Sequence, residues 1–134
     1  MEILGIGSEI VECLRIGRMV EQHGELFLNR VFTPREIRFC QSRKHATEYF
    51  AGRWAAKEAV LRCLGAAARA GIDWTDLEVR DEPDGRPTVM MCGAAKDRVQ
   101  GLRIGNILLT ISHCRAYATA TAIAVRAAGA QPAT

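Results

Sequence analysis

Two short segments about fifty residues apart contain the residues best suited to chemistry. They are Gly5-Ile6-Gly7-Ser8-Glu9-Ile10-Val11-Glu12 and Phe50-Ala51-Gly52-Arg53-Trp54-Ala55-Ala56-Lys57-Glu58-Ala59. The first places the carboxylate of Glu9 after a glycine-containing strand, and the second places that of Glu58 among cations. Mg²⁺ prefers one or two protein carboxylates, with waters and substrate phosphate oxygens as its other ligands. The two segments together therefore predict a magnesium–phosphate site that moves a phosphorus-linked group.

The second segment reads as a helix with its charged residues four positions apart. Arg53 and Lys57 share one face by this spacing, and Glu58 and Arg62 share another. One helix could then hold a metal with a carboxylate while its cations neutralise phosphate oxygens. The alternative is that Glu58 and Arg62 form an exposed salt bridge worth less than about 1 kcal/mol. This helix alone leaves both possibilities open.

For three other features, a functional role and an ordinary structural role are both possible. Glu9 is expected where an apolar strand leaves its sheet, as a metal ligand or as an ordinary exposed acid. His113 ends a strand rich in Ile and Leu, where it can donate to a phosphate or serve as a structural residue. Gly85-Arg86-Pro87 can be a binding loop or a hairpin turn with a solvated arginine.

The elements expected to position these residues form an α+β pattern, with helices mostly in the first half and antiparallel strands in the second. Thr33-Pro34-Arg35-Glu36 predicts a capping box and a helix to about residue 42. Gly65 is expected to end the long helix. The expected strands are 2–9, 75–80, 88–92, 106–112 and 117–125, and the expected helices are 11–23, 33–42, 46–64 and 94–102.

Length and composition indicate a single globular domain. The chain has 134 residues, 49% of them apolar and 25% charged, so we expect one domain over 1–126 and a disordered tail over 127–134. No signal peptide or membrane span is apparent. The five scattered cysteines lack a Cys-x-x-Cys pair, which favours free thiols and a cytoplasmic location. The net charge of +3 fits an acidic partner or a phosphorylated ligand, and is too small to indicate nucleic-acid binding.

These segments, in this order and in so short a chain, resemble the holo-[acyl-carrier-protein] synthases, the small 4′-phosphopantetheinyl transferases. The resemblance runs from about residue 3 to 125. It rests on the opening Gly5–Glu12 segment with Arg15-Ile16, on residues 50–58, on Gly85-Arg86-Pro87, and on Ile111-Ser112-His113.

The resemblance implies a fold, a reaction and an assembly. The fold is an antiparallel sheet packed against a long central helix and shorter helices. The reaction transfers 4′-phosphopantetheine from coenzyme A to a serine of apo acyl carrier protein and leaves adenosine 3′,5′-bisphosphate. The assembly is a homotrimer with active sites at subunit interfaces, and neither nucleic acid nor membrane is a partner.

The resemblance also implies site residues. Glu9 and Glu58 become the catalytic Mg²⁺ ligands, with Mn²⁺ a possible substitute. Arg15 and Arg18 would meet the acidic recognition helix of the carrier protein. Arg62 would lie near the pyrophosphate. Candidates for binding the 3′-phosphate, some from a neighbouring subunit, are Arg53, Lys44 and His113. The adenine side would be lined by Arg86 and Pro87. With Gly65 and Ser112, the expected coenzyme A-binding residues are Lys44, Arg53, Arg62, Gly65, Arg86, Pro87, Ser112 and His113.

Two departures from the family pattern motivate an alternative. The family usually has Asp where this chain has Glu9, and Gly-Thr-Gly where it has Gly65-Ala66-Ala67. A catalytically impaired relative that binds coenzyme A or the carrier protein without transfer is therefore one alternative. A nucleic-acid-binding domain and a two-carboxylate metal nuclease are others, but the aromatic residues are too few for the first and the acidic ligands too few for the second.

Overall fold

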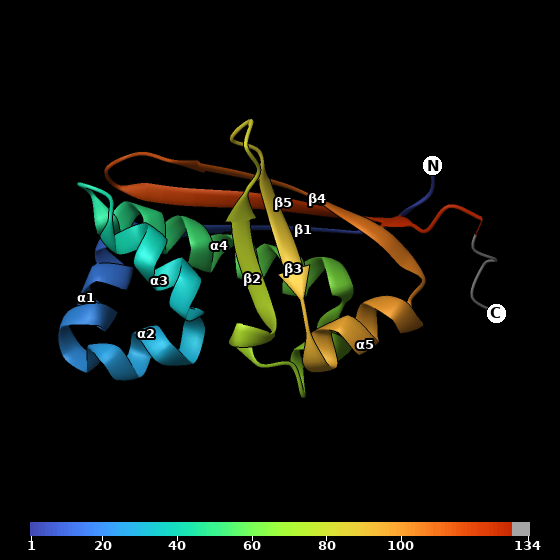
Figure 1. The fold of residues 1–134 in the computed structure, drawn as a ribbon, viewed down its shortest axis with the longest axis horizontal. Coiled ribbons are helices and arrows are strands. Elements are labelled where there is room, and N and C mark those ends of the chain that lie inside the picture. Colours follow the sequence, from blue (N-terminus) through green and yellow to red (C-terminus); the bar gives the residue numbers. More distant parts are fainter. Residues whose placement is uncertain (130–134) are drawn as a thin grey trace.

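A computed structural model describes residues 1–129 of the chain, and it centres on one long helix packed against one sheet (Figure 1). The antiparallel sheet contains β1 (Ile3–Glu12), β4 (Ile104–His113) and β5 (Tyr117–Arg126) in the order β1-β5-β4. Helix α4 (Ala46–Leu64) lies along one face of all three strands. This arrangement confirms the predicted α+β class.

Small residues allow α4 to lie very close to the sheet. The side chains of β5 that face α4 are all buried alanines: Ala118, Ala120, Ala122 and Ala124. In β1 a Cβ added to Gly7 would lie 2.2 Å from the carbonyl oxygen of Ala59, and one added to Gly5 would lie 2.0 Å from that of Cys63. The glycines of the first motif therefore serve close contact between a strand and the central helix.

The other elements surround α4. Helices α1 (Cys13–His23), α2 (Glu25–Val31) and α3 (Pro34–Gln41) lie toward one end of the molecule, and α5 (Gly93–Gly101) lies toward the other (Figure 1). Between them, β2 (Leu77–Asp81) and β3 (Pro87–Met91) form a separate hairpin. Two short 3₁₀ segments, Ala66–Arg69 and Trp74–Asp76, connect α4 to β2.

Several predicted elements match the structure closely. The long helix has the bounds that the sequence predicted. The capping box of α3 is complete, because Glu36 N donates to Thr33 Oγ1 at 3.3 Å and Thr33 N donates to Glu36 Oε1 at 2.9 Å. These features are encoded locally, which explains why the sequence alone identified them.

Three expectations were wrong in detail. Strand β1 extends to Glu12, and α1 begins at Cys13, because the β-branched residues Ile10 and Val11 continue to pair with β5. Helix α2 was missed, since Gly24, with φ 52°, ends α1 and also begins α2. Pro87 belongs to β3 and not to the preceding turn. The expected disordered tail began at Ala127, whose N donates to Arg103 O at 2.8 Å. The rest of that tail from residue 130 to 134 lies outside the described residues.

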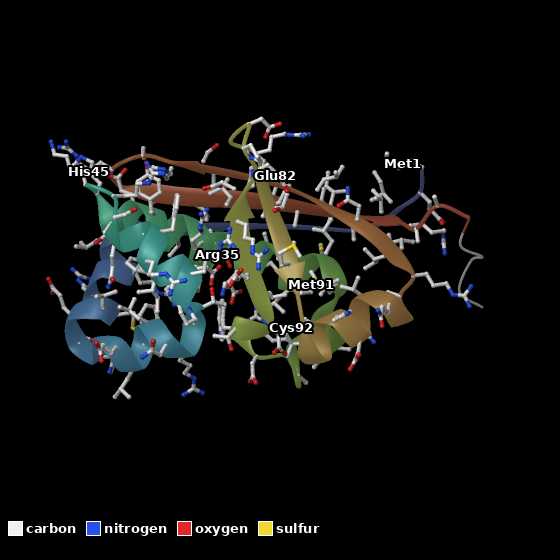
Figure 2. The ribbon with its side chains drawn as sticks, viewed as in Figure 1. Met1, Arg35, His45, Glu82, Met91 and Cys92 are labelled. Atoms are coloured by element: carbon white, nitrogen blue, oxygen red, sulfur yellow. The ribbon has the colours of Figure 1, made fainter. Side chains whose placement is uncertain are left out.

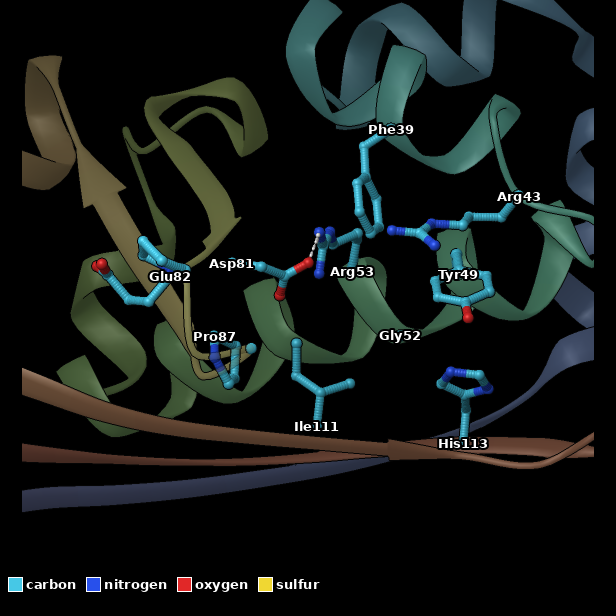
Figure 3. A pocket seen from close by; sticks show the side chains of 12 residues that line it. Phe39, Arg43, Tyr49, Gly52, Arg53, Asp81, Glu82, Pro87, Ile111 and His113 are labelled. Atoms are coloured by element: carbon cyan, nitrogen blue, oxygen red, sulfur yellow. Dashed lines mark hydrogen bonds and ion pairs between the residues drawn. The ribbon is translucent and has the colours of Figure 1, made fainter.

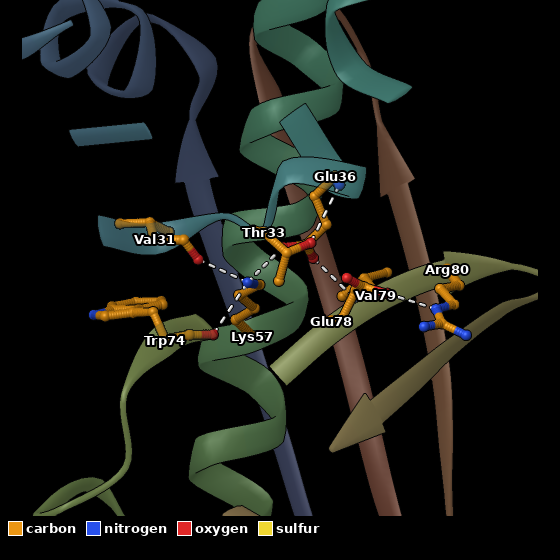
Figure 4. Close-up of polar contacts among 8 residues, drawn as sticks. All are labelled: Val31, Thr33, Glu36, Lys57, Trp74, Glu78, Val79 and Arg80. Atoms are coloured by element: carbon orange, nitrogen blue, oxygen red, sulfur yellow. Dashed lines mark hydrogen bonds and ion pairs between the residues drawn. The ribbon is translucent and has the colours of Figure 1, made fainter. Parts of the chain in front are cut away.

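Lys57 is the centre of a buried polar cluster (Figure 4). Its ammonium lies 2.6 Å from Glu36 Oε1 and donates to the carbonyls of Val31 and Trp74 at 2.7 and 3.1 Å. The other oxygen of Glu36 accepts from Val79 N at 2.8 Å. Burial lowers the pKa of Lys57, while the Glu36 carboxylate opposes that shift.

This cluster ties the segments before and after α4 to the helix. Removing one partner of such a buried pair typically costs about 3–5 kcal/mol. Of the helix cations that could have neutralised substrate phosphate, Lys57 is therefore not free to do so, because its three donors are already used inside the protein. No helix within residues 1–129 is long and apolar enough to cross a membrane.

Candidate active site

A cleft of about 450 Å³ lies between α3, α4, β4 and the β2–β3 hairpin (Figure 3). Arg53 lies in this cleft and is almost fully buried. Its Nη2 donates to Asp81 Oδ2 at 3.1 Å, and its guanidinium lies 4.3 Å from the ring centroid of Phe39. Arg53 Nε has no hydrogen-bond partner among the described residues. A buried, positively charged group thus retains an unused donor beside an open cleft, which suits an anionic ligand.

Two more basic side chains, Arg43 and His113, face the same cleft. The Arg43 guanidinium lies 4.6 Å from the ring centroid of Phe39 and 5.6 Å from that of Tyr49. The His113 ring packs against Tyr49 at 4.8 Å, and its Nδ1 lies 3.2 Å from Glu48 Oε1. Aromatic contacts and a carboxylate therefore hold these groups in place, so that ligand binding orders fewer free side chains.

Glu9 and Glu58 come from facing elements, β1 and α4. Residues 5, 7 and 9 of β1 alternate toward α4, and the closest contacts of Gly5 and Gly7 are with residues 59–63 of the helix. Glu9 Oε2 accepts from Arg62 Nη2 at 2.9 Å, and Glu58 Oε2 accepts from Arg69 Nη2. Arg62 therefore bridges α4 to β1, and the anticipated exposed pair between Glu58 and Arg62 is replaced by two pairs with other partners.

The position of Glu9 differs from the expected one. Glu9 lies inside β1, opposite Ala120 of β5, and does not mark where the strand leaves the sheet. Three further residues of β1 pair with β5 beyond it. Glu9 is consequently held by paired strand on both sides, which restricts where its carboxylate can reach.

The two carboxylates are suitable ligands for a hard divalent cation. Glu58 and Glu9 have only 5% and 15% of their side chains exposed, so each needs a compensating positive charge. Within the described part of the chain no group of three or more His, Cys, Asp or Glu side chains could enclose a metal. Two protein carboxylates with open positions fit Mg²⁺, which keeps several waters and binds substrate phosphates.

Five further predicted residues are spread over three hollows. Pro87 lines the first cleft with Arg53 and His113. Lys44 and Arg18 line a second, of about 590 Å³, at the end of the molecule where Figure 2 labels His45. A third, of about 410 Å³, is lined by Leu61, Arg62, Gly65, Ala66 and Arg69.

Three predicted residues are not brought to these hollows. Arg86 is highly exposed in the hairpin turn, where its Nε donates to Asp84 Oδ2 at 2.8 Å, as the alternative interpretation of this motif expected. Ser112 is exposed and lies next to His113 in β4, so it points to the opposite face of the sheet. Arg15 lies over the ring of Trp54 at 5.7 Å, at the exposed side of α1.

Comparison with known proteins gives a consistent result. A family model described as the 4′-phosphopantetheinyl transferase superfamily matches residues 5–122. The chain belongs to this superfamily. It is 46% identical over 121 residues to the holo-[acyl-carrier-protein] synthase of Koribacter versatilis, covering 90% of this chain and 97% of that protein. It is 45% identical to the synthase of Rhodopirellula baltica, covering 90% and 95%.

Solved structures of holo-[acyl-carrier-protein] synthases have the same fold as this phosphopantetheinyl transferase. The protein from Neisseria meningitidis gives a TM-score of 0.86 at 26% identity, covering 93% of this chain and 100% of that chain. The protein from Bacillus anthracis, solved in complex with CoA (3′,5′-ADP), gives 0.76 at 29% identity, covering 92% and 97%.

Sequence reasoning missed several residues of this transferase's clefts. Phe39, Tyr49 and Asp81 carry no chemical pattern in the sequence, and only the fold brings them to Arg53. Arg43 had a signal that was not used, because it begins the basic run Arg43-Lys44-His45. Arg69 follows three alanines with no recognisable pattern, and its role depends on the turn that the chain makes after Gly65.

Proposed function

We propose that this phosphopantetheinyl transferase is a holo-[acyl-carrier-protein] synthase. It transfers 4′-phosphopantetheine from coenzyme A to a serine of apo acyl carrier protein and releases adenosine 3′,5′-bisphosphate. The observation that carries this proposal is the pair of enclosed carboxylates on β1 and α4, next to arginine-lined hollows, in a chain whose relatives carry this name.

Coenzyme A occupies the first cleft with its nucleotide end. The unused Nε of Arg53, the guanidinium of Arg43 and the ring of His113 supply donors for the 3′-phosphate. Pro87 offers an apolar surface at the opposite wall for the adenine. Support for this placement comes from the concentration of cations and flat side chains in one cleft.

Glu9 and Glu58 would hold Mg²⁺, and Mn²⁺ could replace it. The ion, when bound, neutralises charge on the pyrophosphate as the phosphoanhydride bond breaks. Arg62 contacts Glu9 and would therefore lie near a pyrophosphate bound at this metal site. The carrier serine must lose its proton as it attacks the β-phosphorus. Glu58 is the chain's own candidate to accept that proton through a water.

The carrier protein docks on α1. Arg15 and Arg18 are exposed on this helix, and Lys44 and Arg115 line the adjoining hollow. A positive surface next to the reaction site would attract the acidic recognition helix of an acyl carrier protein and orient it. Salt would therefore lower the rate of association more than the rate of transfer.

The active unit is a homotrimer with its sites at subunit interfaces. The face of the sheet that does not contact α4 exposes large apolar side chains, namely Ile6, Ile10, Leu108 and Tyr117. Large apolar side chains that stay exposed on one sheet face favour an interaction site there. Ser112 lies on the same face, which favours a role toward a neighbouring subunit. A cytoplasmic location is supported by the five cysteines, all of which are free.

The deciding experiment is intact-mass spectrometry of an apo acyl carrier protein incubated with this protein, coenzyme A and Mg²⁺, beside an EDTA control. We expect a metal-dependent gain of one phosphopantetheine on the carrier. Glu58→Gln should lower the rate by about two to four orders of magnitude, since it removes a metal ligand and a proton acceptor. Coenzyme A binding without transfer, with several carriers tried, would favour the impaired-relative alternative, which the comparisons do not support.

A further inference from the structure

We propose that Arg69 is a counterion that a divalent metal displaces from Glu58, and that the released guanidinium then binds the pyrophosphate of coenzyme A. This inference rests on the function proposed above. Its basis is the ion pair between Arg69 Nη2 and Glu58 Oε2. This pair joins the 3₁₀ segment Ala66–Arg69 to the preceding helix α4. Arg62 stands in the same relation to Glu9.

The two members of each pair differ strongly in burial. Glu58 and Glu9 have 5% and 15% of their side chains exposed, whereas Arg69 and Arg62 have 53% and 56% exposed. Glu58 projects from the largely buried helix α4 and has little freedom to move into solvent, whereas a half-exposed arginine can swing away from its partner. When one pair has to open, the arginine is therefore the partner that moves.

The metal-free protein needs these arginines. A largely buried carboxylate without a partner is strongly unfavourable. Arg62 and Arg69 remove that cost by neutralising one carboxylate each. A divalent cation between Glu9 and Glu58 supplies the same charge, so metal and arginine compete for the same oxygens.

The released arginine has a place to go. Arg69 and Arg62 line the same hollow of about 410 Å³, beside Gly65. The segment that carries Arg69 lies between Gly65 and Gly71, whose φ angles are 98° and 91°. A guanidinium in this hollow presents paired donors that match phosphate oxygens. The same side chain thus opposes metal binding in the free protein and favours substrate binding once the metal is present.

The test compares wild-type protein with Arg69→Gln in two titrations. Mn²⁺ alone is titrated first and followed by the electron paramagnetic resonance signal of the free ion. Coenzyme A is then titrated calorimetrically in saturating Mn²⁺. We expect Arg69→Gln to bind Mn²⁺ about threefold to tenfold more tightly, and coenzyme A about tenfold more weakly. Arg30→Gln is the matched control, because it removes one exposed arginine from α2, away from all three hollows.

The opposite signs separate this role from the others. If Arg69 had only a structural role, Arg69→Gln would bind both Mn²⁺ and coenzyme A more weakly. If Arg69 only competed with the metal, Arg69→Gln would bind Mn²⁺ more tightly and would bind coenzyme A more tightly or with unchanged affinity. Unchanged or weaker Mn²⁺ binding in a folded Arg69→Gln protein overturns the inference. Arg69→Lys, which keeps the charge, should restore most of the wild-type behaviour if Arg69→Gln folds poorly. Wild-type protein that binds neither Mn²⁺ nor coenzyme A contradicts the proposed function itself.

Discussion

At the scale of single residues, the first cleft places arginine side chains against aromatic rings, which suits the anionic ligand proposed for it. Arg43 shows this most clearly, because Phe39 and Tyr49 both pack against its guanidinium. The ring contacts position the charge at the cleft before any ligand arrives. We therefore expect Arg43 to contribute to coenzyme A binding and not to the bond-making step.

Replacing Arg43 should weaken coenzyme A binding and leave the chemical step nearly unchanged. We expect Arg43→Gln to raise the KM for coenzyme A about tenfold, with kcat within about twofold, because one charge-assisted contact is lost equally from the substrate and the transition state. Steady-state kinetics with varied coenzyme A measure both values. Arg38→Gln, which removes an exposed arginine from the last turn of α3, serves as the control. An equal fall in kcat for Arg43→Gln would place this residue in the chemistry instead.

The candidate residues could be predicted only where they belong to a local pattern. Glu9 and Glu58 were identified from their motifs, and the structure places them on facing elements. Their partners Arg62 and Arg69 depend on how β1 lies against α4 and on the turn after Gly65, which no local pattern encodes. The burial of Lys57 could not be predicted for the same reason, because it is produced by four separate segments.

At the scale of elements, the distance between β1 and α4 determines whether the two carboxylates can share a metal. Gly7 sets that distance, because a Cβ there would lie 2.2 Å from Ala59 O and 2.7 Å from Cys63 N. Both contacts are with helix backbone, which cannot yield as a flexible side chain can. The strand would have to move away from the helix, and Glu9 would move with it.

Gly7→Ala should therefore damage both stability and activity. We expect a loss of about 3 kcal/mol in the free energy of unfolding, at the upper end for overpacking, and weaker Mn²⁺ binding because the carboxylates separate. Urea unfolding and a Mn²⁺ titration measure the two effects. Gly101→Ala is the matched control: a Cβ at that position meets nothing within 4 Å, so we expect stability to stay the same or to rise by about 0.5–1 kcal/mol. A fully stable Gly7→Ala protein would show that β1 can shift freely.

Elements stabilised by contacts within a few residues were predicted correctly, and elements that depend on distant segments were not. The long helix and the α3 capping box follow from contacts within a few residues, and both were predicted correctly. The end of β1 depends on pairing with β5, more than a hundred residues away, so the sequence placed it three residues early. Helix α2 has seven residues, too few to show a clear periodicity, and it was missed.

At the scale of the whole molecule, the sheet has one face covered by α4 and one face exposed. The exposed face carries Ile6, Ile10, Leu108 and Tyr117. Two of the strands that form this face also carry site residues, because Glu9 belongs to β1 and His113 belongs to β4. Association through this face would bring residues of a neighbouring subunit to the edges of the clefts. The proposed trimer and the proposed active site are thus linked by the same three strands.

A charge on the exposed sheet face should therefore break the assembly and the activity together. Ile6 has 67% of its surface exposed and faces away from α4, so Ile6→Glu should leave the fold of one chain intact. We expect wild-type protein to have the mass of three 14.7 kDa chains by light scattering, and Ile6→Glu to have the mass of one, because an interface cannot desolvate an unpaired carboxylate cheaply. Transfer activity of the variant should fall at least tenfold if the sites need a neighbouring subunit.

Leu26→Glu is the control for the mass measurement, because Leu26 is even more exposed, at 81%, but lies on α2, away from the sheet. It should keep the trimer mass, which would show that loss of assembly is specific to the sheet face. An Ile6→Glu protein that remains trimeric would assign the interface to another surface. An Ile6→Glu monomer with full activity would show that one chain provides a complete site, so that Arg53, His113 and the carboxylate pair act without help from a neighbour. The mass measurement therefore shows which surface joins the chains, and the activity measurement shows whether transfer requires the assembled trimer.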